Sequence, residues 1–181
     1  LLRYSKRFEI LGVVDHRHAG QMSSKFVSNC QDNVPIFSDI NKAIEGLGTK
    51  PEFLVIGLSF HGGQLPQSHR GAVNQALGAG IHVVSGLHQL LGEDLEFSKT
   101  AKEFGSTIFD IRRPRKIEDL TFWSGKIMGL KTPRIAVLGT DCALGKRTTC
   151  QFLMQACDKS NIKTELIYTG QTGFLQGFKH G

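Results

Sequence analysis

The residues with the clearest chemical meaning form a glycine-bounded segment, 139–149, between an apolar run and a predicted helix. Its glycines let successive backbone N–H groups face inward, the helix N-terminus adds partial positive charge, and Lys146 supplies a full charge. This combination predicts a phosphate-binding P-loop, and the alternative is an ordinary turn with a solvent-facing lysine. The residues predicted to bind phosphate or cofactor are Gly139, Thr140, Asp141, Cys142, Gly145, Lys146, Arg147 and Thr148.

The loop departs from the usual P-loop pattern in two ways. Five residues, instead of four, separate its glycines, and Arg147 follows the lysine where Ser or Thr is usual. The hydroxyl that usually binds magnesium is therefore displaced. Thr148 or Thr149 could replace it only with a shifted helix start, because one residue turns a helix by about 100°. The extra cation favours binding of a diphosphate over hydrolysis of ATP.

A second group of small polar residues, 169–173, follows the next predicted strand. The carboxyl ends of parallel strands meet at one edge of a sheet, which is where open α/β sheets bind ligands. Gln171 and Thr172 are therefore candidates for positioning a polar group of a substrate. A glycine-rich turn without a ligand is the alternative interpretation.

Two histidines follow strands of the N-terminal half. His61 lies in the turn 59–66, and His88 follows the next strand, so either could act as a general base or polarise a carbonyl. The two would be close together if their strands are neighbours, and ordinary loop histidines are the alternative. Asp15 ends an earlier strand, where dinucleotide-binding domains often bind a ribose, but no G-x-G-x-x-G precedes it.

Composition narrows the class of partner. A net charge of +6 suits anionic ligands, yet the only basic run, 112–116, contains no aromatic residue, which favours phosphorylated small molecules over nucleic acid. No apolar run approaches the roughly 20 residues that span a bilayer, so no membrane association is expected. The four cysteines lack C-x-x-C spacing and the histidines lack metal-ligand spacing. We expect reduced thiols, a cytoplasmic location and no metal site.

Apolar runs that alternate with helical patterns set the fold class. The chain is predicted to be α/β, with a Rossmann-like parallel sheet covered on both faces in residues 1–111. The strands are predicted at 8–15, 34–37, 53–58, 81–85 and 107–111, with helices at 38–47, 67–77 and 93–104.

Residues 112–132 are predicted to be a linker to a second unit, 133–181. This unit is predicted to contain a strand at 134–138, a helix at 146–159 and a strand at 164–168, the beginning of a P-loop NTPase-like α/β domain. Such a domain needs several more strand–helix units, and the chain opens without Met. We therefore expect both domains to be truncated, the first at its N-terminus and the second at its C-terminus.

These motifs give the chain a resemblance to the D-glutamate N-acetyltransferase-like family, long catalogued as a domain of unknown function. The resemblance covers nearly the whole sequence and is carried by residues 139–146 and 169–173, with support from 62–66 and 84–88. It implies a Rossmann-like domain joined to a P-loop domain. It also implies acetyl transfer from acetyl-CoA to the amine of D-glutamate, with the P-loop holding phosphates of CoA or of a nucleotide.

Two other functions stay open at this point. The start of the loop, Gly139-Thr140-Asp141, is similar to that of dethiobiotin synthetase, which would imply a kinase or ligase that uses ATP with magnesium. A non-enzymatic nucleotide-binding module is the third interpretation, because the motifs do not identify a base or a nucleophile. The expected partner is a small amino-acid substrate, and a homo-oligomer is compatible with the sequence.

Overall fold

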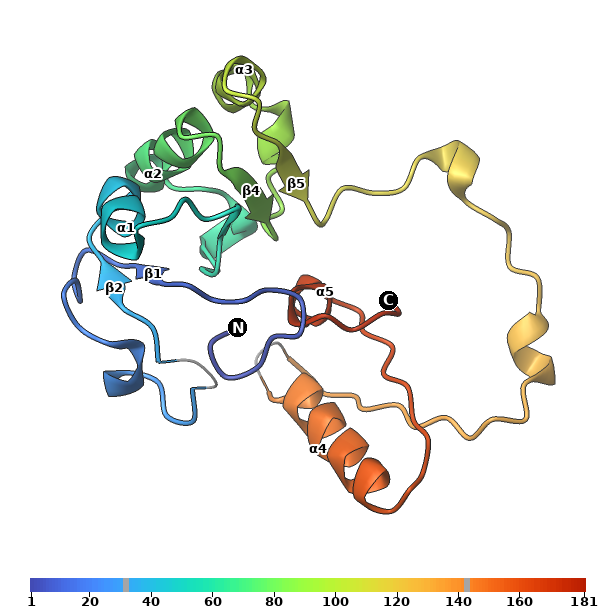
Figure 1. Cartoon of the computed structure of the whole chain (residues 1–181). Coiled ribbons are helices and arrows are strands. Elements are labelled where there is room, and N and C mark those ends of the chain that lie inside the picture. The colour runs from blue at the N-terminus through green and yellow to red at the C-terminus, as the bar shows by residue number, and fades with distance from the viewer. Residues whose placement is uncertain (31–32, 142–143) are drawn as a thin grey trace.

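Parallel strands form two small sheets in the first half of the chain (Figure 1). The computed structural model describes residues 1–30, 33–141 and 144–181. One sheet pairs β1 with β2, and the other has the order β3-β4-β5. The prediction of a Rossmann-like α/β unit with a parallel sheet is thereby confirmed. The strands are β1 (Val13–Val14), β2 (Ile36–Phe37), β3 (Phe53–Val55), β4 (His82–Ser85) and β5 (Ile108–Asp110).

Every strand is shorter than its apolar run predicted. The run 8–15 contributes only its end, Val13–Val14, to a ladder, because only those residues have a paired neighbour in β2. The predicted turn 59–66 contains a short 3₁₀ helix, η2 (His61–Gly63). A further 3₁₀ turn, η3 (Leu91–Glu93), lies between β4 and the following helix.

The helices of the first half pack on one face of the β3-β4-β5 sheet. They are α1 (Ile40–Leu47), α2 (Gln67–Gly78) and α3 (Leu95–Glu103), all close to their predicted bounds. Phe97, Leu77 and Val83 are fully buried between these helices and the sheet. The opposite face carries the neighbouring rings of Phe53, His82 and Phe109, and Phe109 remains 46% exposed. Among the described residues, helical cover therefore lies on one face, not on both as predicted.

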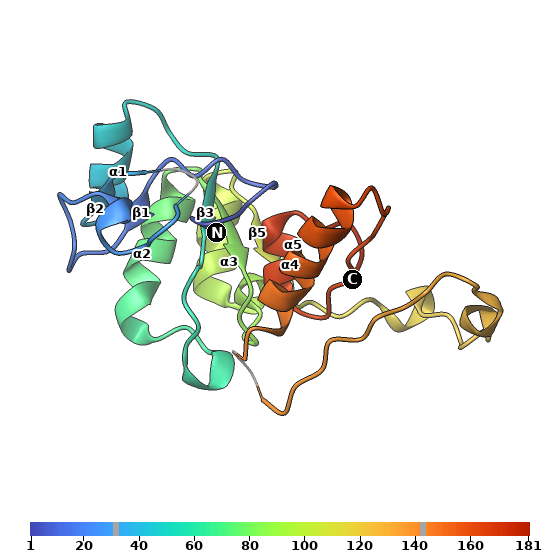
Figure 2. The same cartoon turned by 90° about the horizontal axis from the view of Figure 1, so that it is seen from below.

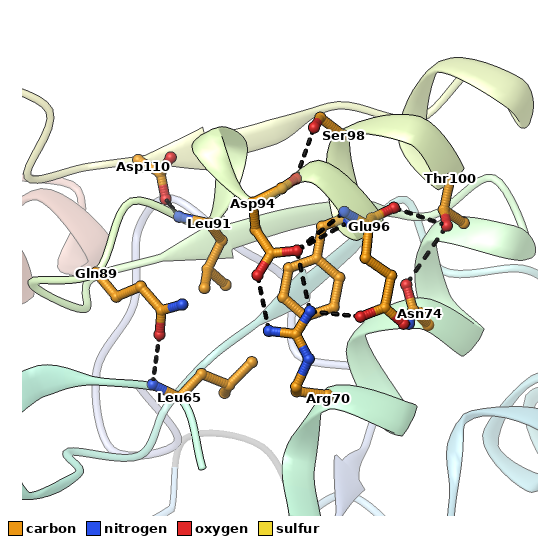
Figure 3. A network of polar contacts seen from close by, with 11 residues as sticks. Leu65, Arg70, Asn74, Gln89, Leu91, Asp94, Glu96, Ser98, Thr100 and Asp110 are labelled. Atoms are coloured by element: carbon orange, nitrogen blue, oxygen red, sulfur yellow. Dashed lines mark hydrogen bonds and ion pairs between the residues drawn. The ribbon is translucent and has the colours of Figure 1, made fainter. Parts of the chain in front are cut away.

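A polar network joins α2 to the start of α3 (Figure 3). The Asp94 carboxylate caps α3 by accepting hydrogen bonds from Glu96 N and Phe97 N, and it also accepts two hydrogen bonds from the Arg70 guanidinium at 2.7 and 2.9 Å. Arg70 donates a third hydrogen bond to Glu96 and lies over the Phe97 ring. These contacts fix the helices that support the strand ends.

The chain leaves this body after β5 (Figure 1). Residues 112–133 form an exposed arm with two 3₁₀ turns, η4 (Ile117–Asp119) and η5 (Lys126–Gly129), and Figures 1 and 2 both show it as a long excursion. The arm leads to α4 (Lys146–Lys159) and α5 (Gln171–Gln176). The helix predicted at 146–159 is thus confirmed.

Neither predicted strand of the second unit joins a sheet. Residues 134–138 are extended but unpaired, with Ile135 77% and Leu138 86% exposed, and 164–168 form a single bridge, Ile167 with His180. A strand needs a hydrogen-bonded neighbour, and the described residues supply none for 134–138. The predicted turn 169–173 is also different, because Gln171 begins the helix α5.

Across residues 1–30, 33–141 and 144–181, no helix is both long enough and apolar enough to cross a membrane.

Candidate functional site

A cleft of about 490 Å³ opens at the carboxyl ends of the β3-β4-β5 sheet. In Figure 1 the arrowheads of β4 and β5 point toward α5, which lies across this edge. The cleft volume is in the range of small-molecule sites, and its place at the strand ends is where open α/β sheets bind ligands. Its described lining residues are Leu58, Ser59, Phe60, Gly62, Gly63, Gly86, Leu87, His88, Arg112 and Gln171.

The first wall of the cleft is a glycine turn that packs against His88. Gly62 and Gly63 both have φ +67°, a left-handed conformation that suits glycine. The Gly63 carbonyl accepts hydrogen bonds from His88 N at 2.9 Å and Gln89 N at 3.1 Å. A Cβ at Gly63 would overlap the His88 side chain, so the absence of a side chain permits this close approach. The histidine is thereby held beside the turn, exposed to the cleft.

The second wall depends on a carboxylate clamp at the end of β5. Asp110, whose side chain is 2% exposed, accepts a hydrogen bond from Leu91 N at 2.9 Å (Figure 3). It accepts a second hydrogen bond from Gly92 N, also at 2.9 Å. Ile111 N then donates to Ser85 O at 2.9 Å, which continues the pairing of β5 with β4. The chain is thus held beside β4 as far as Arg112, the next residue.

Arg112 reaches from this strand end to two other parts of the chain. Its Nε donates to the Gly86 carbonyl at 2.9 Å, and its Nη2 donates to Gln171 Oε1 of α5. Gly86 also packs against Gln171, because a Cβ at Gly86 would lie 2.7 Å from Gln171 Cγ. Residues separated by 59 positions in sequence therefore meet at one point of the cleft.

The helix α5 is held in place by the beginning of the chain. Lys6 N donates to Gln176 O at 3.0 Å, and the Arg7 guanidinium donates to Phe174 O at 2.6 Å while it lies over the Phe174 ring. Gln151 of α4 adds one hydrogen bond to Gln176, at 3.2 Å. These contacts orient the N-terminal turn of α5, and hence Gln171, toward the strand ends.

The predicted P-loop has an inward-turned lysine. The left-handed Gly145, at φ +85°, precedes α4, and Lys146 donates from Nζ to the Asp141 carbonyl. The Lys146 stem lies against Gly139, where a Cβ would be 3.1 Å from Lys146 Cδ. The Thr149 hydroxyl donates to Gly145 O at 3.2 Å. The Lys146 side chain therefore turns back toward Gly139 and Asp141, at the start of the predicted loop.

The structure brings together some of the predicted site residues. His88 and Gln171 line the cleft, whereas the described P-loop residues are not among its lining. Thr140, Arg147 and Thr148 are exposed, and Thr172 lies half-buried in α5. Cys142 and the side chain of His61 lie outside the described residues.

Asp15, considered for ribose binding, lies beside His18 and does not line the cleft. His18 Nδ1 donates to its carboxylate at 2.7 Å, and this hydrogen bond lowers the pKa of Asp15, helped by a hydrogen bond from Arg17 N.

Sequence reasoning missed Arg112. The basic run 112–116 predicted a solvated linker, although its first member directly follows a strand. A charged side chain at the carboxyl end of a parallel strand was the signal that could have identified it.

Comparisons with known proteins cover both halves of the chain. A family model described as a domain of unknown function, the Rossmann-like domain DUF1611_N, matches residues 16–114. The model of the P-loop domain of the same family, DUF1611_C, matches residues 121–181.

Two relatives carry the same name. A D-glutamate N-acetyltransferase from Tritonibacter scottomollicae is 32% identical over 171 residues, which are 91% of this chain and 48% of that protein. A D-glutamate N-acetyltransferase from a Pseudoalteromonas species is 33% identical over 129 residues, 71% of this chain and 37% of that protein.

A solved structure is similar over nearly the whole chain. The crystal structure of a DUF1611 family protein from Anabaena variabilis matches with a TM-score of 0.84 and 32% identity, covering 99% of this chain and 50% of that one. This chain thus spans about half the length of the relatives that it matches, or less.

Proposed function

This chain belongs to the DUF1611 family, and from that premise we propose that it is part of an N-acetyltransferase that acetylates the amine of D-glutamate with acetyl-CoA. The names of two relatives at 32% and 33% identity support this activity. The observation that carries the proposal is the cleft, since its lining joins the 62–63 and 86–88 turns of the first domain to Gln171 of the second. Three of the four motifs behind the resemblance therefore meet at one site.

The proposed reaction is a transfer of the acetyl group between sulfur and nitrogen. The substrate amine, in its neutral form, attacks the thioester carbonyl, the new C–N bond forms, and the C–S bond breaks. One proton leaves the nitrogen and one is taken up by the CoA thiolate, so the charges balance. His88 is the proposed proton acceptor, because its side chain lines the cleft and a neutral imidazole has a ring nitrogen that can accept a proton.

The P-loop is proposed to hold the phosphates of CoA. Lys146 and Arg147 supply positive charge at the start of α4, and the loop N–H groups, with Thr140, Asp141 and Gly145, supply the cradle. The inward-turned ammonium of Lys146, which donates to a loop carbonyl, supports this assignment. A phosphate oxygen would be a stronger acceptor for that ammonium than a neutral carbonyl is.

An acetylation assay tests the proposed function. The purified protein is expected to release free CoA thiol from acetyl-CoA only when D-glutamate is present, and mass spectrometry is expected to show the N-acetylated product. Lys146→Ala should raise the KM for acetyl-CoA about tenfold or more, because a charged hydrogen bond to phosphate is lost. Lys159→Ala removes the same charge from the exposed far end of α4 and serves as the matched control.

The result that contradicts the proposal is the absence of D-glutamate acetylation, or equal KM values for acetyl-CoA in the two lysine variants. Magnesium-dependent turnover of ATP would instead favour the kinase or ligase. Tight nucleotide binding without turnover of any substrate would favour the binding module.

A further inference from the structure

Arg112 is a cation without a carboxylate partner among the described residues. The acceptors of its hydrogen bonds are the carbonyl of Gly86 and the side-chain amide of Gln171, both neutral. A guanidinium carries a positive charge and five N–H donors. Its Nη1 donors have no hydrogen-bond partner in the part of the chain that the structure describes, and the side chain lines the cleft.

Two other arginines of the chain have carboxylate partners. Arg70 is paired with Asp94 and Glu96, and Arg113, the next residue along the chain, donates to Glu93 at 3.0 Å and lies 3.6 Å from Asp110. The charges of these two side chains are compensated by carboxylates. At the cleft, by contrast, a fixed positive charge faces the space that a ligand would fill.

The surroundings of Arg112 favour an anion. The amide oxygen of Gln171 accepts the hydrogen bond from Arg112. The NH₂ group of the same amide therefore points away from Arg112 and is an additional donor. No Asp or Glu is present among the described residues that line the cleft, so an anionic ligand would meet no like charge there. The hydrogen bond to the Gly86 carbonyl fixes the guanidinium before a ligand arrives, which reduces the entropy lost on binding.

We propose that Arg112, oriented by Gly86 and assisted by Gln171, binds a carboxylate of the amino-acid substrate in this cleft. A planar guanidinium fork matches the two oxygens of a carboxylate, and the P-loop supplies separate cations, Lys146 and Arg147, for phosphates. The inference rests on the proposed function for the identity of the ligand as an acidic amino acid. It explains how the site would distinguish acidic amino acids from neutral ones.

Direct binding without acetyl-CoA tests this assignment. Calorimetric titration of the purified protein with D-glutamate, and separately with glutarate, is expected to show binding of both. Glutarate carries two carboxylates and no amine, so its binding does not depend on any acetylation activity. Arg112→Gln should raise both Kd values about 10- to 100-fold, the loss expected for a charged hydrogen bond.

Arg113→Gln is the matched control, since it removes the same charge from the neighbouring position, where carboxylates already compensate it. Its Kd values should stay within about twofold of wild type. Arg112→Lys keeps the charge but lacks the fork, so its affinities should lie between those of wild type and Arg112→Gln. Circular dichroism and thermal unfolding establish whether each variant is folded. If Arg112→Gln is unfolded, the Kd values of Arg112→Lys test the inference in its place.

The outcomes separate this inference from the proposed function. Any one of three results would overturn the inference. The first is an equal loss of affinity in Arg112→Gln and Arg113→Gln, and the second is an unchanged affinity in Arg112→Gln or in Arg112→Lys. The third is that the wild-type protein binds neither ligand. Selective loss in Arg112→Gln supports it even if no acetylation occurs. Acetylation that is insensitive to Arg112 would leave the proposed function standing and remove the role of this residue.

Discussion

Two adjacent glycines at the cleft allow backbone strain to be separated from a steric contact. Gly62 and Gly63 share φ +67°, so an alanine at either position adopts a left-handed conformation that costs about 1–2 kcal/mol. At Gly62 a new Cβ meets nothing within 4 Å, whereas at Gly63 it would lie 2.9 Å from both Cβ and Cγ of His88 and overlap the ring. Rotation of the ring alone cannot relieve a contact with His88 Cβ.

The backbone at His88 must therefore move in Gly63→Ala, although its N–H is bonded to the Gly63 carbonyl. Overpacking of this kind costs about 1–3 kcal/mol beyond the strain. We expect Gly62→Ala to lower the free energy of unfolding by about 1–2 kcal/mol and Gly63→Ala to lower it by about 2–5 kcal/mol. Urea denaturation measures both values, and the m-values should be the same as for wild type.

The ring of His88 provides a second readout. Its NMR signals should shift clearly in Gly63→Ala and stay near their wild-type positions in Gly62→Ala, and acetylation should fall more in the former. Equal destabilisation of the two variants, with equal His88 spectra, would refute the contact between this glycine turn and the histidine.

Three further substitutions test the supports of the cleft. Asp94→Asn retains an N-cap oxygen but loses the ion pair with Arg70, so urea denaturation at pH 7 should show about 1–3 kcal/mol less stability. Hydrogen bonds from Arg70 lower the pKa of Asp94. The Asp94 carboxylate therefore stabilises the fold above the usual aspartate pKa, and this stabilisation is lost as pH falls through the lower folded-state pKa. The difference in free energy of unfolding between Asp94→Asn and wild type should therefore narrow on acidification. Gly86→Ala should displace Gln171 and raise the Kd for D-glutamate severalfold in calorimetry while the sheet stays folded, and an unchanged Kd would contradict the packing. Asp110→Asn places an amide NH₂ donor against one of the two backbone N–H groups, since each donates to a different carboxylate oxygen, and urea denaturation should show a free energy of unfolding lower by about 1–3 kcal/mol.

Local patterns predicted the helices well and the strand lengths poorly. The four helices α1 to α4 lie close to their expected bounds because caps and periodicity are properties of the segment itself. The N-cap of α1 is Asp39, whose carboxylate accepts a hydrogen bond from Lys42 N and another from the Ser38 hydroxyl. A strand depends on neighbours elsewhere in the chain, so the apolar run at 134–138 predicted a strand that has nothing to pair with among the described residues.

The same difference between local patterns and contacts with distant residues explains which site residues the sequence identified. His88 and Gln171 follow strands or strand-like segments and were identified from that position alone. Arg112 was assigned to a linker because its composition resembles one, and only the hydrogen bond of Ile111 to Ser85 shows that the ladder continues to its edge. The clamp by Asp110 was likewise invisible, because its partners Leu91 and Gly92 lie 19 and 18 positions away and are backbone groups with no sequence signature.

One segment that lines the cleft, α5, has few contacts with the rest of its own domain. Gln171 is contributed by α5, a short helix that α4 contacts through one hydrogen bond, Gln151 to Gln176, while residues 4–7 hold it more extensively. The opposite side of the contact, Gly86 and Arg112, is rigid because β4 and β5 fix it. A carboxylate bound between Arg112 and Gln171 would therefore add contacts at the junction of the two domains, and its binding would stabilise the position of α5 at the sheet edge.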